Sequence, residues 1–188
     1  MSIIAPDYYN SYNILSIDPG SFNTGFAVIH IENNNIVSIF ARTIEVNKIN
    51  DRTGLDSEAH SEKNIRLNKL RMIYSDILER YKPIAVVCES PFYNRAFPAA
   101  YGSLLTVMNI FQNALMYYNC NIPFFTMEPL LVKALVGAGF KKGKSDVKLA
   151  VSQLPEIMTT LTVDLNSLDE HSIDAIAVGY SYLKKSGF

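Results

Sequence analysis

The alternation of apolar and polar positions predicts three consecutive strands at the beginning of the chain. Residues 14–18 form a short apolar run that ends at an Asp-Pro-Gly turn, and residues 25–31 form a second run rich in β-branched side chains. Three asparagines at 33–35 are typical of a hairpin turn, and a third strand is expected over residues 36–46. These three strands can pair as an antiparallel meander.

The next segment has helical rather than strand periodicity. Residues 47–61 are polar and are expected to form an exposed loop, whereas apolar residues recur at helical spacing within residues 62–81. Pro83 ends this helix. Residues 84–88 then form a nearly continuous apolar run, which is typical of a central strand covered on both faces, and Glu89 follows it directly.

The remainder of the chain alternates between helices and strands. The expected elements are a loop over 91–100, a helix over 101–118, a strand over 122–127, a helix over 129–136, a glycine-containing loop over 137–143, a helix from Ser145 to before Pro155, and a last helix from near His171 to Lys185. This order predicts an α/β fold with a mixed central sheet, in which the antiparallel meander is joined by parallel strands and flanked by helices. We expect residues 1–188 to form a single domain.

Composition narrows the range of functions. The chain is 188 residues long, 48% hydrophobic and 19% charged, which is sufficient for a packed core. Its formal net charge is −1, so a nucleic-acid partner would have to be bound by a local basic patch. Cys88 and Cys120 belong to no zinc-spaced set. We expect no signal peptide and no membrane span, and therefore a cytoplasmic protein.

Acidic residues at strand ends and in apolar surroundings are the strongest candidates for chemistry. Asp18 and Glu89 each end a predicted strand, and Asp174 lies among apolar residues of the last helix, three positions after His171. Each alone also fits an ordinary structural role, but together they favour a site, because buried carboxylates require partners. Three carboxylates and an imidazole suit Mg²⁺ or Mn²⁺, and two such ions can act on one phosphodiester.

These residues lie in three segments that resemble RuvC-type Holliday junction resolvases. The segments are ILSIDPGSFNTGFAVI within residues 14–31, RLNKLRMIYSDILERYKPIAVVCESPF over 66–92, and HSIDAIAVGY over 171–180. The resemblance implies a ribonuclease-H-like fold and a homodimer that makes paired symmetric cuts in four-way DNA junctions with Mg²⁺ or Mn²⁺, leaving 5′-phosphate ends. It implies that Asp18, Glu89, His171 and Asp174 are metal ligands, with His171 alternatively a proton-transfer group.

Two further segments suit a DNA substrate. One is basic and carries Lys141, Lys142, Lys144 and Lys148, although a solvated lysine loop would have the same composition. The other follows Glu89 and carries Phe92, Tyr93, Arg95 and Phe97, whose rings could stack on unpaired bases or fold back onto the core. In the resembled family an aromatic residue at the position of Phe92 helps to open the junction, and the helix over 101–118 helps to pair the subunits.

Two other functions remain open at this point. Actin-like ATP-binding proteins also begin a phosphate loop with Asp-x-Gly after a strand, although 188 residues leave little room for their two lobes. A catalytically inactive junction-binding protein, or a relative that acts on RNA, would keep the same fold. The role of a resolvase would be recombination and repair, or debranching of viral DNA in a host cytoplasm.

Overall fold

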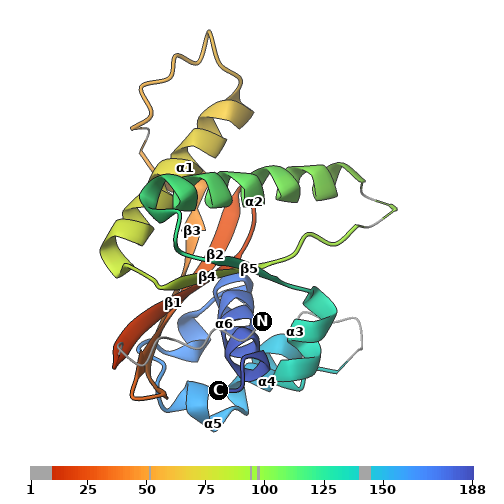
Figure 1. Ribbon diagram of the computed structural model, residues 1–188. Coiled ribbons are helices and arrows are strands. Elements are labelled where there is room, and N and C mark those ends of the chain that lie inside the picture. Colours follow the sequence, from red (N-terminus) through yellow and green to blue (C-terminus); the bar gives the residue numbers. More distant parts are fainter. Residues whose placement is uncertain (1–9, 51, 94, 97, 140–144) are drawn as a thin grey trace.

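The computed structural model, which describes residues 10–50, 52–93, 95–96, 98–139 and 145–188, contains one mixed sheet (Figure 1). Its strands are β1 (Ser11–Asp18), β2 (Asn23–Glu32), β3 (Asn35–Glu45), β4 (Ala85–Glu89) and β5 (Phe124–Met127), in the spatial order β3-β2-β1-β4-β5. The first three strands form an antiparallel meander, and β4 and β5 run parallel to β1. The predicted fold class is therefore confirmed.

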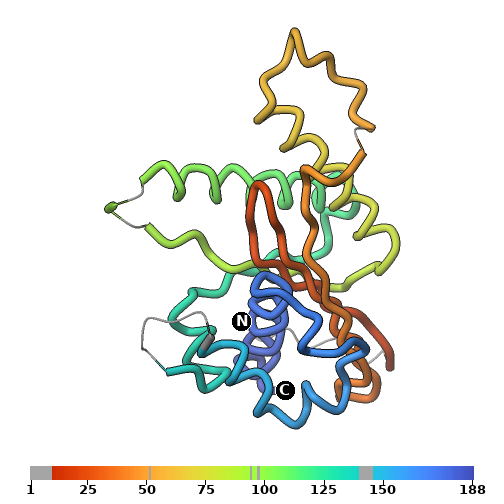
Figure 2. Tube along the Cα trace, turned by 180° about the vertical axis from the view of Figure 1, so that it is seen from behind, coloured from red at the N-terminus to blue at the C-terminus, as the bar shows by residue number. Residues whose placement is uncertain are grey.

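Helices cover both faces of this sheet (Figures 1 and 2). One face carries α1 (Glu62–Tyr81) and α2 (Pro98–Asn119). The other carries α6 (Glu170–Lys185), with α3 (Pro129–Val136), α4 (Ser145–Ser152) and α5 (Pro155–Met158) around it. Two short 3₁₀ helices, η1 (Val46–Lys48) and η2 (Leu165–Ser167), complete the described elements.

The central strands supply alternate residues to two hydrophobic cores. In β1, Ile14 packs into the core beneath α6, whereas Leu15 and Ile17 pack into the core beneath α1 and α2. In β4, Val87 faces α6 and Val86 faces the opposite core. Because both faces are buried, both sets of alternating positions must be apolar, which explains the nearly continuous apolar run of β4.

Local signals set most element boundaries, and several expectations need correction. The loop predicted over 91–100 is too long, because α2 begins at Pro98, which is well suited to the first position of a helix. The strand predicted from residue 122 begins at Phe124, and β1 begins earlier than expected, at Ser11. The loop predicted from Asn47 also contains part of η1, and the short helices α5 and η2 were not predicted.

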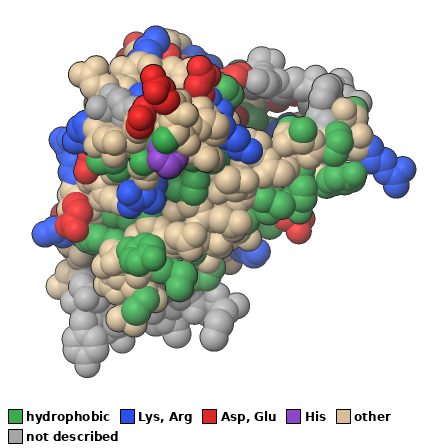
Figure 3. Space-filling view, turned by 90° about the horizontal axis from the view of Figure 1, so that it is seen from above, with side chains coloured by type: hydrophobic (Ala, Val, Ile, Leu, Met, Phe, Trp, Pro, Cys, Tyr) green, Lys and Arg blue, Asp and Glu red, His purple; other side chains and the backbone are tan. Residues whose placement is uncertain are grey.

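The N-terminal part of α2 projects beyond the edge of the sheet, on the side where α3 lies (Figure 1). Seen from above, this projection carries many hydrophobic side chains on its surface (Figure 3). Phe92 and Tyr93, which lie between β4 and α2, are exposed by 63% and 56%. The projection therefore offers apolar surface to a partner near the carboxyl ends of β4 and β5.

Candidate active site

Asp18 and Glu89 lie at the same edge of the sheet because they end neighbouring parallel strands. Ile17 of β1 is in register with Cys88 of β4, so the two carboxylates occupy the next position along each strand. The Asp18 side chain is 13% exposed, and Glu89 is half-buried. The carboxyl ends of parallel strands are where ligands bind in α/β sheets, and the structure brings the first two candidate residues to that edge.

The first turn of α6 brings His171 to Asp18. His171 Nδ1 lies 2.7 Å from Asp18 Oδ2, within hydrogen-bond distance. This approach depends on Gly25, which is paired with Asp18 across the β1–β2 ladder. A Cβ atom at Gly25 would lie 1.9 Å from the carbonyl oxygen of His171, so any larger residue there would displace the helix.

Side chains at the start of α6 hold this turn in place. Asp169 is the N-cap and accepts a hydrogen bond from the backbone N–H of Ser172 at 3.0 Å. Thr43 of β3 donates its hydroxyl to Asp169 Oδ1 at 2.5 Å and lies 2.8 Å from Ser172 Oγ. The helix that carries His171 and Asp174 is thus tied to the sheet at the end nearest Asp18.

A second close contact fixes the middle of α6. The buried Ser16 hydroxyl donates to the carbonyl of Ala175 at 2.7 Å. Gly179 packs so closely that a Cβ atom there would lie 2.6 Å from both Ser16 Oγ and Ile29 Cδ1. The helix therefore lies directly on β1 and β2, which sets the height of Asp174 above the sheet.

Burial and mutual repulsion disfavour the charged forms of these carboxyl groups. Burial, followed by the nearby charges of Asp18 and Asp174, raises the pKa of Glu89 to about 8. Burial and the Asp18 charge similarly raise the pKa of Asp174 to about 6. The hydrogen bond to Asp18 raises the pKa of His171. These effects show that Asp18, Glu89 and Asp174 are close enough to interact electrostatically.

The donor chemistry of this site fits a hard divalent cation. The charged forms of three carboxyl groups repel one another here, and a bound cation would relieve that repulsion. Across the described ranges, however, no three histidine, cysteine or acidic side chains are arranged as a ready metal-holding group. A carboxylate oxygen has two lone pairs, so Asp18 Oδ2 can keep its contact with His171 while Asp18 binds a cation.

Comparison with known proteins identifies the family. A family model described as crossover junction endodeoxyribonuclease RuvC matches residues 14–182. This range includes Asp18, Glu89, His171 and Asp174. The chain belongs to the RuvC family of crossover junction endodeoxyribonucleases.

Curated RuvC proteins are similar over most of their length. A crossover junction endodeoxyribonuclease RuvC of Prochlorococcus marinus (strain AS9601) is 23% identical over 175 residues, covering 93% of this chain and 98% of the relative. One from Desulforamulus reducens is 31% identical over 148 residues, covering 77% of this chain and 82% of the relative. These matches support the family and its enzymatic class.

Solved RuvC-family structures share the fold. T. thermophilus RuvC in complex with a Holliday junction substrate superimposes with a TM-score of 0.64 at 17% identity, covering 93% of this chain and 96% of that chain. The yeast mitochondrial Holliday junction resolvase Ydc2 gives a TM-score of 0.66 at 13% identity, covering 97% and 83%. At these identities the likeness supports the ribonuclease-H-like architecture alone.

The structure describes some, but not all, of the residues that the sequence predicts to contact DNA. Phe92, Tyr93 and Arg95 are exposed just beyond β4, so Phe92 does not fold back onto the core. Lys148 is half-exposed on α4. The predictions for Phe97 and for Lys141, Lys142 and Lys144 concern positions outside the described residues.

One charged residue near the RuvC-type site was missed by the sequence analysis. Lys133 of α3 lowers the pKa of both Glu89 and Asp174, although burial and the carboxylates outweigh it. It escaped notice because α3 was predicted only as a short helix. The usable signal was its position: α3 follows β5 directly, so its residues lie near the carboxyl edge of the sheet.

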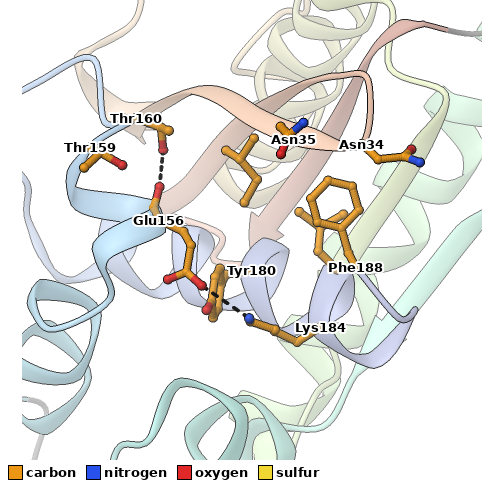
Figure 4. Close-up of a pocket in the computed structure, with 10 residues that line it drawn as sticks. Asn34, Asn35, Glu156, Thr159, Thr160, Tyr180, Lys184 and Phe188 are labelled. Carbon is orange, nitrogen blue, oxygen red and sulfur yellow. Dashed lines mark hydrogen bonds and ion pairs between the residues drawn. The ribbon is translucent and has the colours of Figure 1, made fainter.

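A pocket near the C-terminal part of α6 lies away from the acidic site. It has a volume of about 340 Å³ and lies near the C-terminal part of α6, where Tyr180 and Lys184 line it with Glu156 and Phe188 (Figure 4). Lys184 Nζ lies 3.4 Å from Glu156 Oε1. Along a helix with a rise of about 1.5 Å per residue, Lys184 is roughly 20 Å from His171, so this pocket is separate from the acidic site.

Among the helices described, none has the length and apolar character to cross a membrane.

Proposed function

We propose that this protein is a metal-dependent endonuclease that resolves four-way DNA junctions by paired symmetric cuts, leaving 5′-phosphate ends. The observation that carries the proposal is the grouping of Asp18, Glu89 and Asp174 around the carboxyl edge of β1 and β4, with His171 bonded to Asp18. This grouping occurs in a chain whose residues 14–182 match the RuvC family. The grouping of the carboxylates and the family match both favour nuclease chemistry over an actin-like ATP-binding function.

In this proposal Asp18, Glu89, His171 and Asp174 hold two Mg²⁺ or Mn²⁺ ions. When bound, the ions activate the attacking water and stabilise the charge that develops on the scissile phosphate. Glu89 and Asp174 must lose their protons to bind a cation, and their raised pKa values make this loss part of metal binding. Their partial burial also keeps bulk water from competing for the same oxygens.

His171 orients Asp18 in the resting site. Its Nδ1 lies 2.7 Å from Asp18 Oδ2, while its Nε2 lies 3.8 Å from Glu170 Oε1. The raised pKa of His171 keeps a larger fraction of the ring protonated near neutral pH than a free histidine would have. While protonated, His171 can donate a proton at Nε2, and to serve as a metal ligand it would first have to lose its proton.

The proposed DNA surface surrounds this site. Phe92 and Tyr93 offer rings to unpaired bases, and Arg95 offers a cation to the phosphates. The lysine segment, Lys141, Lys142, Lys144 and Lys148, would contact the backbone of a junction arm. The T. thermophilus RuvC neighbour, whose structure contains a Holliday junction substrate, supports branched DNA as the ligand class.

A homodimer would explain paired cuts, because two sites related by a two-fold axis match a two-fold junction. We propose that α2 contributes to the subunit interface. The biological role would be recombination and repair, or debranching of viral DNA.

A substrate comparison tests the proposed function. The protein is incubated with Mg²⁺ and end-labelled four-way junction, flap, duplex or RNA substrates, and the products are separated on a denaturing gel. We expect paired cuts at symmetric positions in the four-way junction and much slower cutting of duplex. Binding without cutting would indicate an inactive junction-binding protein, and preferential cutting of RNA would indicate a different substrate class; either result would contradict the proposal.

A further inference from the structure

A separate pocket adjoins the active site between the end of β4 and the start of α3. It has a volume of about 310 Å³. It is lined by Ser90, Pro91, Phe92 and Tyr93 after β4 and by Glu128, Pro129 and Leu130 after β5. All seven residues belong to the described chain, and together they form a slot that combines apolar and aromatic walls with polar atoms and one acidic side chain.

The strand register places this pocket one step beyond the active-site carboxylate. Glu89 is paired with Met127 across the β4–β5 ladder, and Ser90 N–H donates to the Met127 carbonyl at 2.8 Å. The chain therefore enters the two walls of the pocket immediately after this pair, at Ser90 and at Glu128. A nucleotide in the pocket would lie beside the phosphate presented to Glu89.

The walls have the chemistry of a site for a planar base. Phe92 is 63% exposed and Leu130 is 60% exposed, so apolar surface is available on both sides of the slot. Tyr93 is fixed by an edge-to-face contact with Tyr101 of α2, with ring centroids 5.5 Å apart. Aromatic and apolar walls bind unpaired bases by stacking, because every base has a π face.

Glu128 supplies an acceptor that does not cap α3. It occupies the N-cap position of α3, but its side chain makes no capping hydrogen bond. A carboxylate offers two acceptor oxygens and, unlike an amide, no donor. Guanine has two adjacent N–H groups, at N1 and N2, that can donate to both oxygens together, whereas each of the other three bases offers a carboxylate a donor at one position only.

We propose that this pocket receives an unpaired guanine at the crossover of the cut strand, and that Glu128 selects it by accepting hydrogen bonds from N1 and N2. This inference rests on the proposed junction-resolving function and adds a base preference to it. Phe92 and Leu130 would contact the two faces of the guanine ring, and Glu128 would distinguish the hydrogen-bonding edge of guanine from those of the other bases.

The test measures binding rather than cutting. In the Asp18→Asn background with Mg²⁺, affinities are determined for junctions that differ only in the crossover nucleotide, which is guanine, adenine, cytosine, thymine or inosine. Inosine keeps N1–H but lacks the N2 amino group. We expect the guanine junction to bind about 5- to 100-fold more tightly than the others, with inosine between them. Adding Glu128→Ala should remove this preference, whereas Glu79→Ala, on the exposed surface of α1, should preserve it.

Equal affinity for all five junctions, a preference for another base, or a guanine preference that survives Glu128→Ala would overturn the inference. Those results would leave the resolvase proposal intact if the wild-type protein still cuts junctions. Failure of the wild-type protein to cut any junction would instead contradict the proposed function. Thermal unfolding of the Glu128→Ala variant checks its fold, which should be unchanged because the Glu128 side chain makes no capping bond.

Discussion

The surroundings of Glu89 strongly oppose the ionisation of its carboxyl group. Burial and the charges of Asp18 and Asp174 raise its pKa to about 8, whereas in the unfolded chain it would titrate near 4.5. Between these two pH values the folded protein holds a proton that the unfolded chain has lost. The metal-free protein should therefore lose stability as pH rises from about 5 to 8.

Replacement of Glu89 by glutamine should remove the part of this pH dependence that Glu89 contributes, leaving the smaller part due to Asp174. In EDTA, Glu89→Gln is expected to match the wild-type melting temperature near pH 5 and to exceed it at pH 8.5. The full pKa shift would be worth up to about 4–5 kcal/mol. A gain of only about 1–2 kcal/mol would already correspond to roughly 2–8 °C for a chain of this length. Scanning calorimetry at the two pH values measures the difference, with Glu79→Gln as a surface control. Parallel pH profiles for wild type and Glu89→Gln would contradict the account.

Lys133 should tune cation binding through the same carboxylates. Its charge lowers the pKa of Glu89 and Asp174, so Lys133→Met should raise both values further. We expect Mn²⁺ to bind about 3- to 10-fold more tightly at pH 8.5, because a positive charge beside the cation is removed, and to gain less at pH 6.5, where the cation must displace more protons. Calorimetric titration measures this effect. Lys63→Met, on an exposed part of α1, should not change the affinity, and unchanged or weaker binding by Lys133→Met at pH 8.5 would refute the tuning role.

At the scale of elements, the placement of α6 depends on Gly25. A methyl group there would collide with the His171 carbonyl, so Gly25→Ala should shift the first turn of α6 away from Asp18. We expect a loss of roughly 1–3 kcal/mol in stability, together with slower cleavage. Gly102→Ala is the matched control, because its Cβ would meet open space on α2 and should leave stability equal or slightly higher. Unchanged melting and cleavage for Gly25→Ala would show that the close contact is not required.

The same elements show what the sequence could and could not predict. Both ends of α1 were predictable, because Ser61 caps its start and Pro83 follows its end. The convergence of Asp18 and Glu89 was predictable because parallel strands share an edge. The position of α3 near the carboxyl edge was predictable because α3 follows β5 directly, but the effect of Lys133 on the pKa of Glu89 and Asp174 was not, since it depends on how α3 packs beside the sheet. The close approach of Gly25 to His171 was also hidden, because it joins residues far apart in the chain.

At the scale of the whole molecule, the proposed DNA surface extends beyond the carboxylates. α2 covers one face of the sheet, and α3 with α4 lies against the other (Figure 1). A junction strand bound to the proposed DNA surface would pass the carboxyl ends of β1 and β4. Binding and cutting should therefore be separable, because most of the binding surface lies outside the carboxylates.

The most direct test of this account is junction binding and cleavage by Asp18→Asn, measured side by side with wild type in Mg²⁺. The substitution keeps the size of the side chain but removes the charge that the cations require. We expect junction affinity within about 3-fold of wild type and cleavage reduced by at least ~100-fold. Cleavage by Asp18→Asn at the wild-type rate would contradict the central claim that this carboxylate cluster performs the reaction.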